Sequence, residues 1–250
     1  MGESKNESGL LVFILPFLAV VPALYILEWE SYEASILIVA IPFMTFPVIL
    51  IAGQIYNGTE YWKDKLKEGG ILALGALAAS LSASLWLVYD YVDSLPDFND
   101  QQSITQWLEW VSFDLLQSDY TLTSGTKILG MGVWIDSITL MILFVATFLC
   151  FLICWFSLGY MNTDPINEDR NHRFYGEFVL FALGMFGMVL ADNFLWLFIF
   201  WEVMGLCSYL LIGFYYWKDS AAYASKKAFL TTRVGDVFLM IGLFILYDIY

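Results

Sequence analysis

Seven apolar segments, each near the length needed to cross a lipid bilayer as a helix, recur along this 250-residue sequence. About 20 residues of α-helix span the hydrocarbon core of a membrane. The segments cover residues 9–27, 34–55, 70–92, 134–160, 174–191, 194–216 and 221–248. Hydrophobic residues make up 60% of the sequence and charged residues only 14%, whereas soluble domains average about 25% charged residues. The sequence therefore predicts an all-α, polytopic transmembrane helix bundle of about seven helices.

The basic residues predict the orientation of these helices. With the N-terminus inside, nine of the eleven lysines and arginines fall in inside loops, in line with the positive-inside tendency. These nine are Lys5, Lys63, Lys65, Lys67, Arg170, Arg173, Lys218, Lys226 and Lys227. Acidic residues bring the formal net charge to -14 and crowd residues 90–119, where they are interpreted as solvated surface. No block of like charge resembles a nucleic-acid-binding tail, so nucleic acid is not an expected partner.

Two local patterns predict departures from straight helices. Alternating residues around "SDYTLTSGTKILGMGVWIDS", at 118–137 in the outside loop, predict a short β-hairpin before the fourth helix. Pro42 and Pro47 fall inside the second segment and are expected to kink the helix rather than break it. In a membrane, neighbouring helices and side chains can satisfy the carbonyls that proline leaves without a donor.

The sequence holds no motif for a bound cofactor or metal. It has no dinucleotide-binding glycine pattern, no phosphate-binding loop and no zinc-ligand spacing. Cys150, Cys154 and Cys207 lie in apolar segments and are expected to be buried small hydrophobic residues. No cofactor is therefore expected in this chain.

Charged residues inside the apolar segments mark the candidate functional site. Glu202 lies near the middle of the sixth segment, where a charge costs about 2.5–3.5 kcal/mol on insertion scales. Such a carboxylate either belongs to an ion path or only holds helices together. In the seventh segment, Arg233 and Asp236 are three residues apart and can pair along the helix. Lys226 and Lys227 lie near the inner boundary, where both side chains can snorkel to water.

Residues 132–250 resemble a known family over their whole length. The motifs "ADNFLWLFIFWEVMGLCSYLLIGFYY" (191–216) and "KKAFLTTRVGD" (226–236) resemble the antiporter-like L subunit of proton-pumping NADH–quinone oxidoreductase. This enzyme is respiratory complex I, and the mitochondrial counterpart of the subunit is ND5. "WIDSITLMILFVATFLCFLICWFSLGYM" (134–161) and "HRFYGEFVLFALGMFGMVLADN" (172–193) resemble the two preceding helices of the same family. Residues 34–92 resemble the same family more weakly, but their pattern is compatible with it.

The resemblance implies that the chain is a proton-translocating membrane subunit. Glu202 matches the glutamate of the family's W-E motif, a proton-path residue that pairs with a lysine on a following helix. Arg233, Asp236 and Lys227 match further family charges, which implies a proton path or charge relay with Glu202. No redox chemistry is expected in this chain, because NADH, flavin, iron–sulfur clusters and quinone belong to partner subunits. The expected surroundings are other antiporter-like subunits in a prokaryotic plasma membrane or a mitochondrial inner membrane.

The family plan divides the chain into four parts. Residues 1–33 would add an N-terminal transmembrane helix, and 34–133 would hold two helices and the acidic external loop. Residues 134–185 would form the N-terminal antiporter-like region, and 186–250 the start of the transporter domain. Family members are much longer, so the helices with the partner lysine are expected after Tyr250.

Two alternative functions remain open at this stage. One is a subunit of a Mrp-type sodium/proton antiporter, whose large subunits share this architecture and the W-E glutamate. The other is a structural membrane subunit whose buried charges only lock helices together, without a complete ion path.

Overall fold

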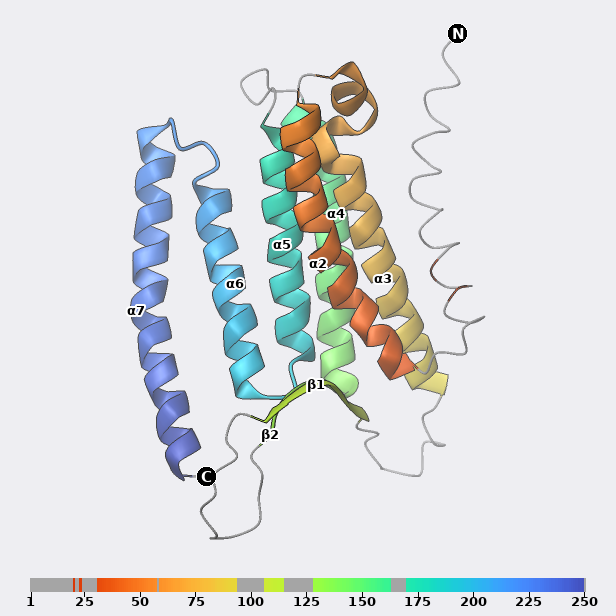
Figure 1. The fold of residues 1–250 in the computed structure, drawn as a ribbon, viewed down its shortest axis with the longest axis vertical. Coiled ribbons are helices and arrows are strands. Elements are labelled where there is room, and N and C mark those ends of the chain that lie inside the picture. Colours follow the sequence, from red (N-terminus) through yellow and green to blue (C-terminus); the bar gives the residue numbers. More distant parts are fainter. Residues whose placement is uncertain are drawn as a thin grey trace.

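The computed structural model describes residues 20, 23, 31–57, 59–93, 106–114, 128–162 and 170–249. Within this part of the chain, six long helices run up and down beside one another (Figure 1). They are α2 (Ser31–Tyr56), α3 (Gly70–Asp93), α4 (Ser137–Asn162), α5 (Asn171–Leu190), α6 (Phe194–Ile212) and α7 (Asp219–Ile249). All six are long and apolar enough to cross a membrane. The predicted all-α transmembrane bundle is thereby confirmed, while the first predicted helix, at 9–27, falls outside the described residues.

A β-hairpin precedes α4, but its position was predicted only in part. Strand β1 (Gln106–Asp114) pairs antiparallel with β2 (Ile128–Ile135). The second strand lies in the predicted segment 118–137, whereas the first lies upstream of it, so the predicted placement of both strands there was wrong. The sequence of β1 is rich in aromatic and β-branched residues, which favour strands. Val133 of β2 also bridges to Ala191, which ties the hairpin to the connection before α6.

Polar caps explain where two of the helices begin and end. The Asp136 carboxylate accepts a hydrogen bond from the backbone N–H of Thr139 at 2.7 Å, which caps the start of α4 and keeps the pKa of Asp136 below its usual value. Helix α6 ends at Ile212 rather than at the predicted residue 216. There the N–H of Gly213 donates to the Tyr209 carbonyl at 3.0 Å and the chain turns towards α7.

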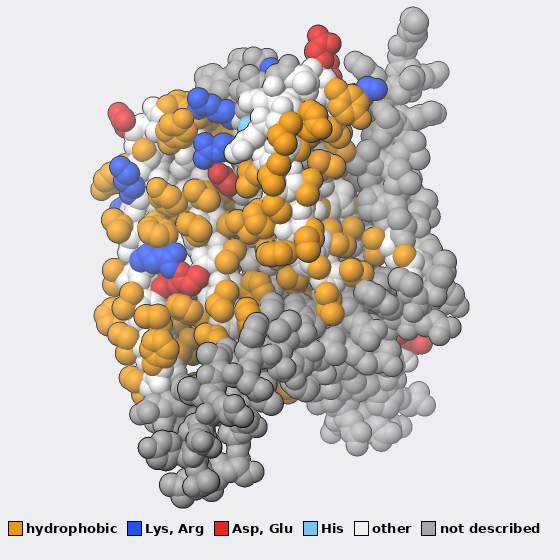
Figure 2. All heavy atoms as spheres, in the orientation of Figure 1, with side chains coloured by type: hydrophobic (Ala, Val, Ile, Leu, Met, Phe, Trp, Pro, Cys, Tyr) orange, Lys and Arg blue, Asp and Glu red, His pale blue; other side chains and the backbone are white. Residues whose placement is uncertain are grey.

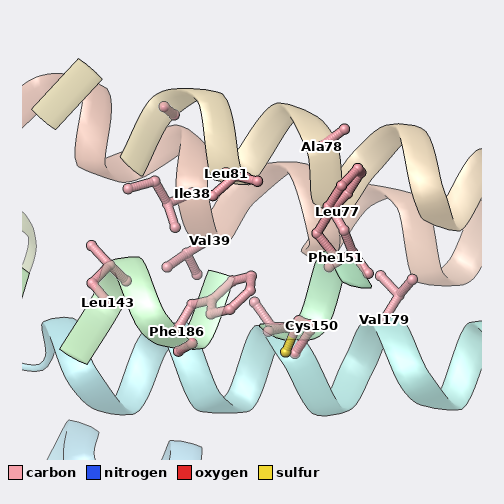
Figure 3. Close-up of a cluster of buried hydrophobic side chains, with 14 of the residues drawn as sticks. Ile38, Val39, Leu77, Ala78, Leu81, Leu143, Cys150, Phe151, Val179 and Phe186 are labelled. Carbon is pink, nitrogen blue, oxygen red and sulfur yellow. The ribbon is translucent and has the colours of Figure 1, made fainter. Parts of the chain in front are cut away.

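The core of the described bundle lies among α2, α3, α4 and α5. A continuous cluster of buried apolar side chains fills the space between these helices. Figure 3 shows part of it, with Ile38, Val39, Leu77, Ala78, Leu81, Leu143, Cys150, Phe151, Val179 and Phe186. Helix α6 packs on α5 and adds the partly buried Phe200 and Leu211, and α7 packs on α6. Helices α2 to α5 therefore form a packed scaffold with the pair α6–α7 at one side.

One contact between α2 and α3 compensates for a proline. Pro42 has no N–H to donate to the Ile38 carbonyl one turn earlier. The Ser80 hydroxyl of α3 donates to that carbonyl instead, with an oxygen–oxygen distance of 3.2 Å. Because Ile38 and Ser80 are fully buried, water cannot reach this carbonyl to donate a hydrogen bond. A neighbouring helix thus satisfies it, as the sequence predicted.

Basic residues gather at one end of the bundle, called the basic end below. The C-terminal ends of α2, α4 and α6 and the N-terminal ends of α3, α5 and α7 all lie there, at the top of Figure 1. Figure 2 shows most of the basic side chains near this end, above a broad band of hydrophobic side chains. The Arg170 guanidinium lies 5.8 Å from the ring centre of Tyr216 and 5.1 Å from that of Trp217. Aromatic residues beside cations are typical of the membrane–water interface.

A buried carboxylate joins the α2–α3 connection to the start of α5 at the basic end. Lys67, Glu68 and Gly69 adopt positive φ angles of 48°, 54° and 90°. This tight turn places the buried Glu68 carboxylate 2.9 Å from the backbone N–H of Asn171, at the start of α5. A negative charge at a helix N-terminus is stabilising, which offsets the cost of the left-handed backbone.

Candidate functional site

Two glycines set how closely α6 approaches α5. A Cβ atom on Gly187 would lie 2.5 Å from the Phe200 ring, and one on Gly184 would lie 3.1 Å from the backbone nitrogen of Met204. Such close contact at small residues is typical of helix pairs in membranes. It fixes one face of α6 against α5 and leaves Glu202 on a face that meets α7.

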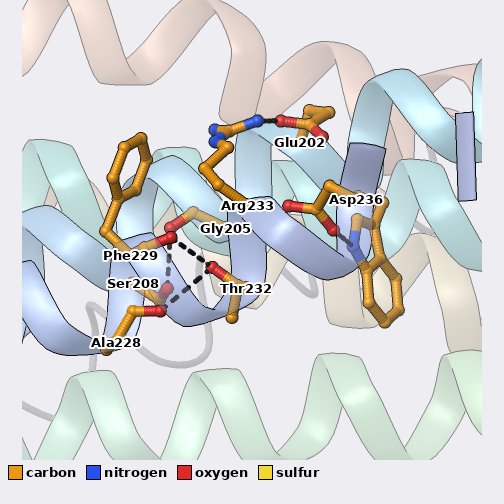
Figure 4. Close-up of polar contacts among 9 residues, drawn as sticks. Glu202, Gly205, Ser208, Ala228, Phe229, Thr232, Arg233 and Asp236 are labelled. Atoms are coloured by element: carbon orange, nitrogen blue, oxygen red, sulfur yellow. Dashed lines mark hydrogen bonds and ion pairs between the residues drawn. The ribbon is translucent and has the colours of Figure 1, made fainter. Parts of the chain in front are cut away.

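The main charged contact joins α6 to α7. Glu202 of α6 forms an ion pair with Arg233 of α7, through Oε2 and Nη1 (Figure 4). The side chains are 21% and 34% exposed in the described structure, so the pair lies at the edge of the interface rather than in its centre. The Phe229 ring lies 4.7 Å from the Arg233 guanidinium and 5.1 Å from the Tyr209 ring. The ring of Phe229, one turn before Arg233 on α7, thus contacts the guanidinium, and Tyr209 of α6 packs against that ring.

Asp236 has a different partner from the one predicted. The indole N–H of Trp201 donates to its carboxylate at 2.9 Å, and the residue is buried. The predicted pairing of Arg233 with Asp236 along α7 was wrong, since Arg233 turns to Glu202. Sequence spacing identifies which charges can meet within a helix, but the contact between two helices decided both partners. The position of Trp201 immediately before Glu202 was the one available signal.

Lys227 does not join this group. It lies six residues before Arg233, about 9 Å along the helix axis towards the basic end. Its side chain is exposed in the described structure, as is that of Lys226. Of the four predicted site residues, Glu202 and Arg233 meet, Asp236 lies within one turn of Arg233, and Lys227 lies apart.

Glu202 lies near the middle of its span. Eight residues separate it from Phe194 and ten from Ile212, which correspond to about 12 Å and 15 Å of helix. Figure 2 shows acidic and basic side chains next to each other at this depth, in an otherwise hydrophobic face. A charge pair at mid-membrane depth that joins two helices can open and close when the helices shift, because each partner is carried by a different element.

A further carboxylate within a span was not among the predicted site residues. Glu177 of α5 is buried and forms an ion pair with Arg173 at 3.6 Å. Cys207 of α6 lies close enough to Glu177 for the two side chains to interact electrostatically. The available signal was a lone glutamate in the apolar segment 174–191.

Comparison with known proteins identifies two matching family models. Residues 122–175 match the family described as NADH-ubiquinone oxidoreductase (complex I), chain 5 N-terminus. Residues 191–250 match the family described as NADH:quinone oxidoreductase/Mrp antiporter, transmembrane. The predicted family resemblance is confirmed. The second match contains all four predicted site residues, whereas Glu177 falls between the two matches.

Relatives from distant organisms agree with this assignment. The chain is 34% identical to NAD(P)H-quinone oxidoreductase chain 5 of Synechocystis sp. over 217 residues, which are 86% of this chain and 28% of the relative. It is 34% identical to NADH-quinone oxidoreductase subunit L of Pseudomonas aeruginosa over 187 residues, 75% of this chain and 27% of that one. It is also 34% identical to F(420)H(2) dehydrogenase subunit L of Methanosarcina mazei over 202 residues, 80% and 26% of the two chains. The chain thus spans under a third of the length of these relatives.

A solved structure shares the fold. A chain of the membrane-bound sulfane sulfur reductase, an archaeal respiratory membrane complex, superposes with a TM-score of 0.61 at 17% identity. The match covers 86% of this chain and 37% of that chain. The arrangement of spans therefore matches that of a respiratory membrane subunit, and the chain is an integral membrane protein with several spans.

Proposed function

We propose that this chain is part of a proton-translocating membrane subunit of an NADH–quinone oxidoreductase of the complex I type. The observation that carries the proposal is the Glu202–Arg233 ion pair, which joins α6 to α7 near mid-membrane. The names of the relatives support it, because chain 5 and subunit L belong to quinone oxidoreductases. In this role the chain couples electron transfer elsewhere in the complex to proton movement.

The proposed mechanism uses a change of charge at Glu202. Arginine stays protonated in proteins, so Glu202 is the member of the pair that takes up and releases a proton. A nearby positive charge favours the ionised carboxylate, and desolvation favours the protonated one. Separating the pair costs several kcal/mol, comparable with about 2.3 kcal/mol for moving one charge across 100 mV. A lysine from a following helix, as the family implies, would compete with Arg233 for Glu202 and so operate this switch.

Partners and cofactors follow from the same proposal. NADH, flavin, iron–sulfur clusters and quinone would be bound by partner subunits, and other antiporter-like subunits would adjoin this one in the bilayer. Asp236 and Lys227 would extend the relay on either side of Arg233. The basic end would face the inside of a prokaryotic plasma membrane, in line with the positive-inside tendency.

The experiment is Glu202→Gln in the complete complex, reconstituted in vesicles, with proton translocation and quinone reduction measured together. We expect proton translocation to fall by about tenfold or more, because a positioned proton-transfer group typically contributes about 10²–10⁴-fold. The complex should still assemble, since glutamine keeps the size of the side chain. Glu60→Gln, an exposed residue in the α2–α3 connection, is the matched control and should pump normally. Normal pumping by the assembled Glu202→Gln complex would rule out this role.

A further inference from the structure

Glu177 is a carboxylate inside a membrane span that the proposed mechanism does not use. It lies on α5, six residues after Asn171, about 9 Å along the helix from the basic end. The residue is 8% exposed, which places it among the buried residues of the scaffold. Ionisable residues within membrane spans are rare and expensive, and they usually mark a path for ions or protons.

The surroundings of its two carboxylate oxygens differ. Oε1 pairs with Arg173, whose side chain is 51% exposed at the basic end. Oε2 is buried and has no hydrogen-bond partner in the described structure. Arg173 and Cys207 are the charged or titratable side chains of this part of the chain that interact with it. The carboxylate therefore has a half-exposed cation beside one oxygen and a buried environment around the other.

A purely structural ion pair does not explain this arrangement. Buried carboxylates that only hold helices together normally have both oxygens hydrogen-bonded, because an unsatisfied buried acceptor is costly. Protonation, by contrast, removes the charge that burial makes costly, so the neutral form suits an oxygen that no donor contacts. The buried Oε2 is the atom on which such a proton would sit.

The depth of Glu177 also fits a role in proton transfer. Glu202 lies about 15 Å along α6 from the end that adjoins the α6–α7 connection, and Glu177 lies about 9 Å along α5 from the same end of the bundle. Cys207 of α6, five residues beyond Glu202, is near enough to Glu177 for the two to interact electrostatically. Of the two carboxylates within α5 and α6, Glu177 thus lies nearer the basic end.

We propose that Glu177 is a proton-binding residue that exchanges protons between water at the basic end and the membrane interior that holds Glu202. A proton leaves water beside Arg173 and forms an O–H bond on Oε2, while Arg173 keeps its charge. The carboxylate is thereby neutralised, and the proton moves on when Glu202 accepts it. This inference rests on the proposed function, because it supplies protons to that site.

The test uses the complete complex in vesicles, with Glu177→Gln, the double variant Arg173→Gln/Glu177→Gln, and Glu202→Gln measured in parallel. We expect Glu177→Gln to lower proton translocation by about tenfold or more. We also expect loss of a carboxylic-acid band from the pH-difference infrared spectrum. The double variant removes both charges of the pair. It should remain defective if Glu177 carries protons, and it should recover if Glu177 only neutralises Arg173.

Each outcome decides between these roles. Normal pumping by Glu177→Gln, recovery in the double variant, or an unchanged infrared spectrum would overturn the inference. If Glu177→Gln does not assemble, Glu177→Asp decides, since an altered pH profile of pumping supports proton binding and an unaltered profile overturns it. A normal Glu202→Gln complex would refute the proposed function separately, so the two failures are distinguishable.

Discussion

Helices α2 to α5 and the pair α6–α7 are all apolar enough to span a membrane but are held together differently. In α2 to α5, large side chains such as Phe186 and Tyr175 are fully buried in one continuous cluster. In α6 and α7, the buried residues of the described structure are Cys207, Ser225 and Asp236. Hydrophobicity alone does not drive helix association in lipid, so packing and polar contacts have to hold helices together. The scaffold relies on packing and the pair α6–α7 on polar contacts.

This difference matches the division of labour in the proposed function. A close-packed interior has few alternative arrangements, because any shift opens voids or forces overlaps. An ion pair between loosely buried helices can separate and re-form with little disturbance of packing. Within the described residues, the Glu202–Arg233 pair thus joins two helices with few fully buried side chains, and the scaffold beside them is close-packed.

The largest expected effect tests the scaffold. Phe186→Ala should lower the free energy of unfolding by about 3–5 kcal/mol, because it leaves a cavity in a fully buried site. Phe238→Ala, at a 70% exposed position on α7, is the matched control and should change it by about 0.5 kcal/mol or less. Thermal unfolding in detergent, followed with a thiol-reactive dye that reaches the buried cysteines on unfolding, measures both. Equal losses would mean that α7 is packed as tightly as the scaffold.

A smaller effect is expected where the two regions meet. Gly187→Ala should lower the free energy of unfolding by about 1–3 kcal/mol, because the new Cβ would overlap the Phe200 ring and push α6 away from α5. Gly75→Ala on α3 is the control, because nothing lies within 4 Å of its Cβ position. It should be neutral or stabilising by about 0.4–1 kcal/mol. The same unfolding assay applies, and a harmless Gly187→Ala would show that α5 and α6 can separate freely.

The smallest effect is expected at Asp236. Asp236→Asn keeps an oxygen that can accept a hydrogen bond from the Trp201 N–H, so the free energy of unfolding should change by about 1 kcal/mol or less. Proton pumping should also fall less than in Glu202→Gln. Asp236→Leu removes the acceptor and should lower stability more. Unfolding and vesicle proton uptake measure both variants. Complete loss of pumping in an assembled Asp236→Asn complex would place Asp236, rather than Glu202, at the centre of the relay.

Local patterns predicted most of the fold but only part of the site. The six described helices match six predicted segments within a few residues, apart from the early end of α6 at Ile212. The hairpin was misplaced because the alternating residues at 118–137 predicted both strands there, whereas β1 lies upstream at Gln106–Asp114. Within the site, Glu202 and Arg233 were identified singly, but their pairing was not. Glu177 was not among the predicted site residues, although it is a charge in an apolar segment.

The sequence by itself determined the number and extent of the described helices and the family, because span length and motif wording are local properties of the chain. Only the tertiary structure decided that Arg233 contacts Glu202, that Trp201 binds Asp236 and that Ser80 serves the carbonyl beneath Pro42. Those contacts depend on how neighbouring helices are rotated against each other. That rotation results from packing at positions such as Gly184 and Gly187, which no single segment encodes.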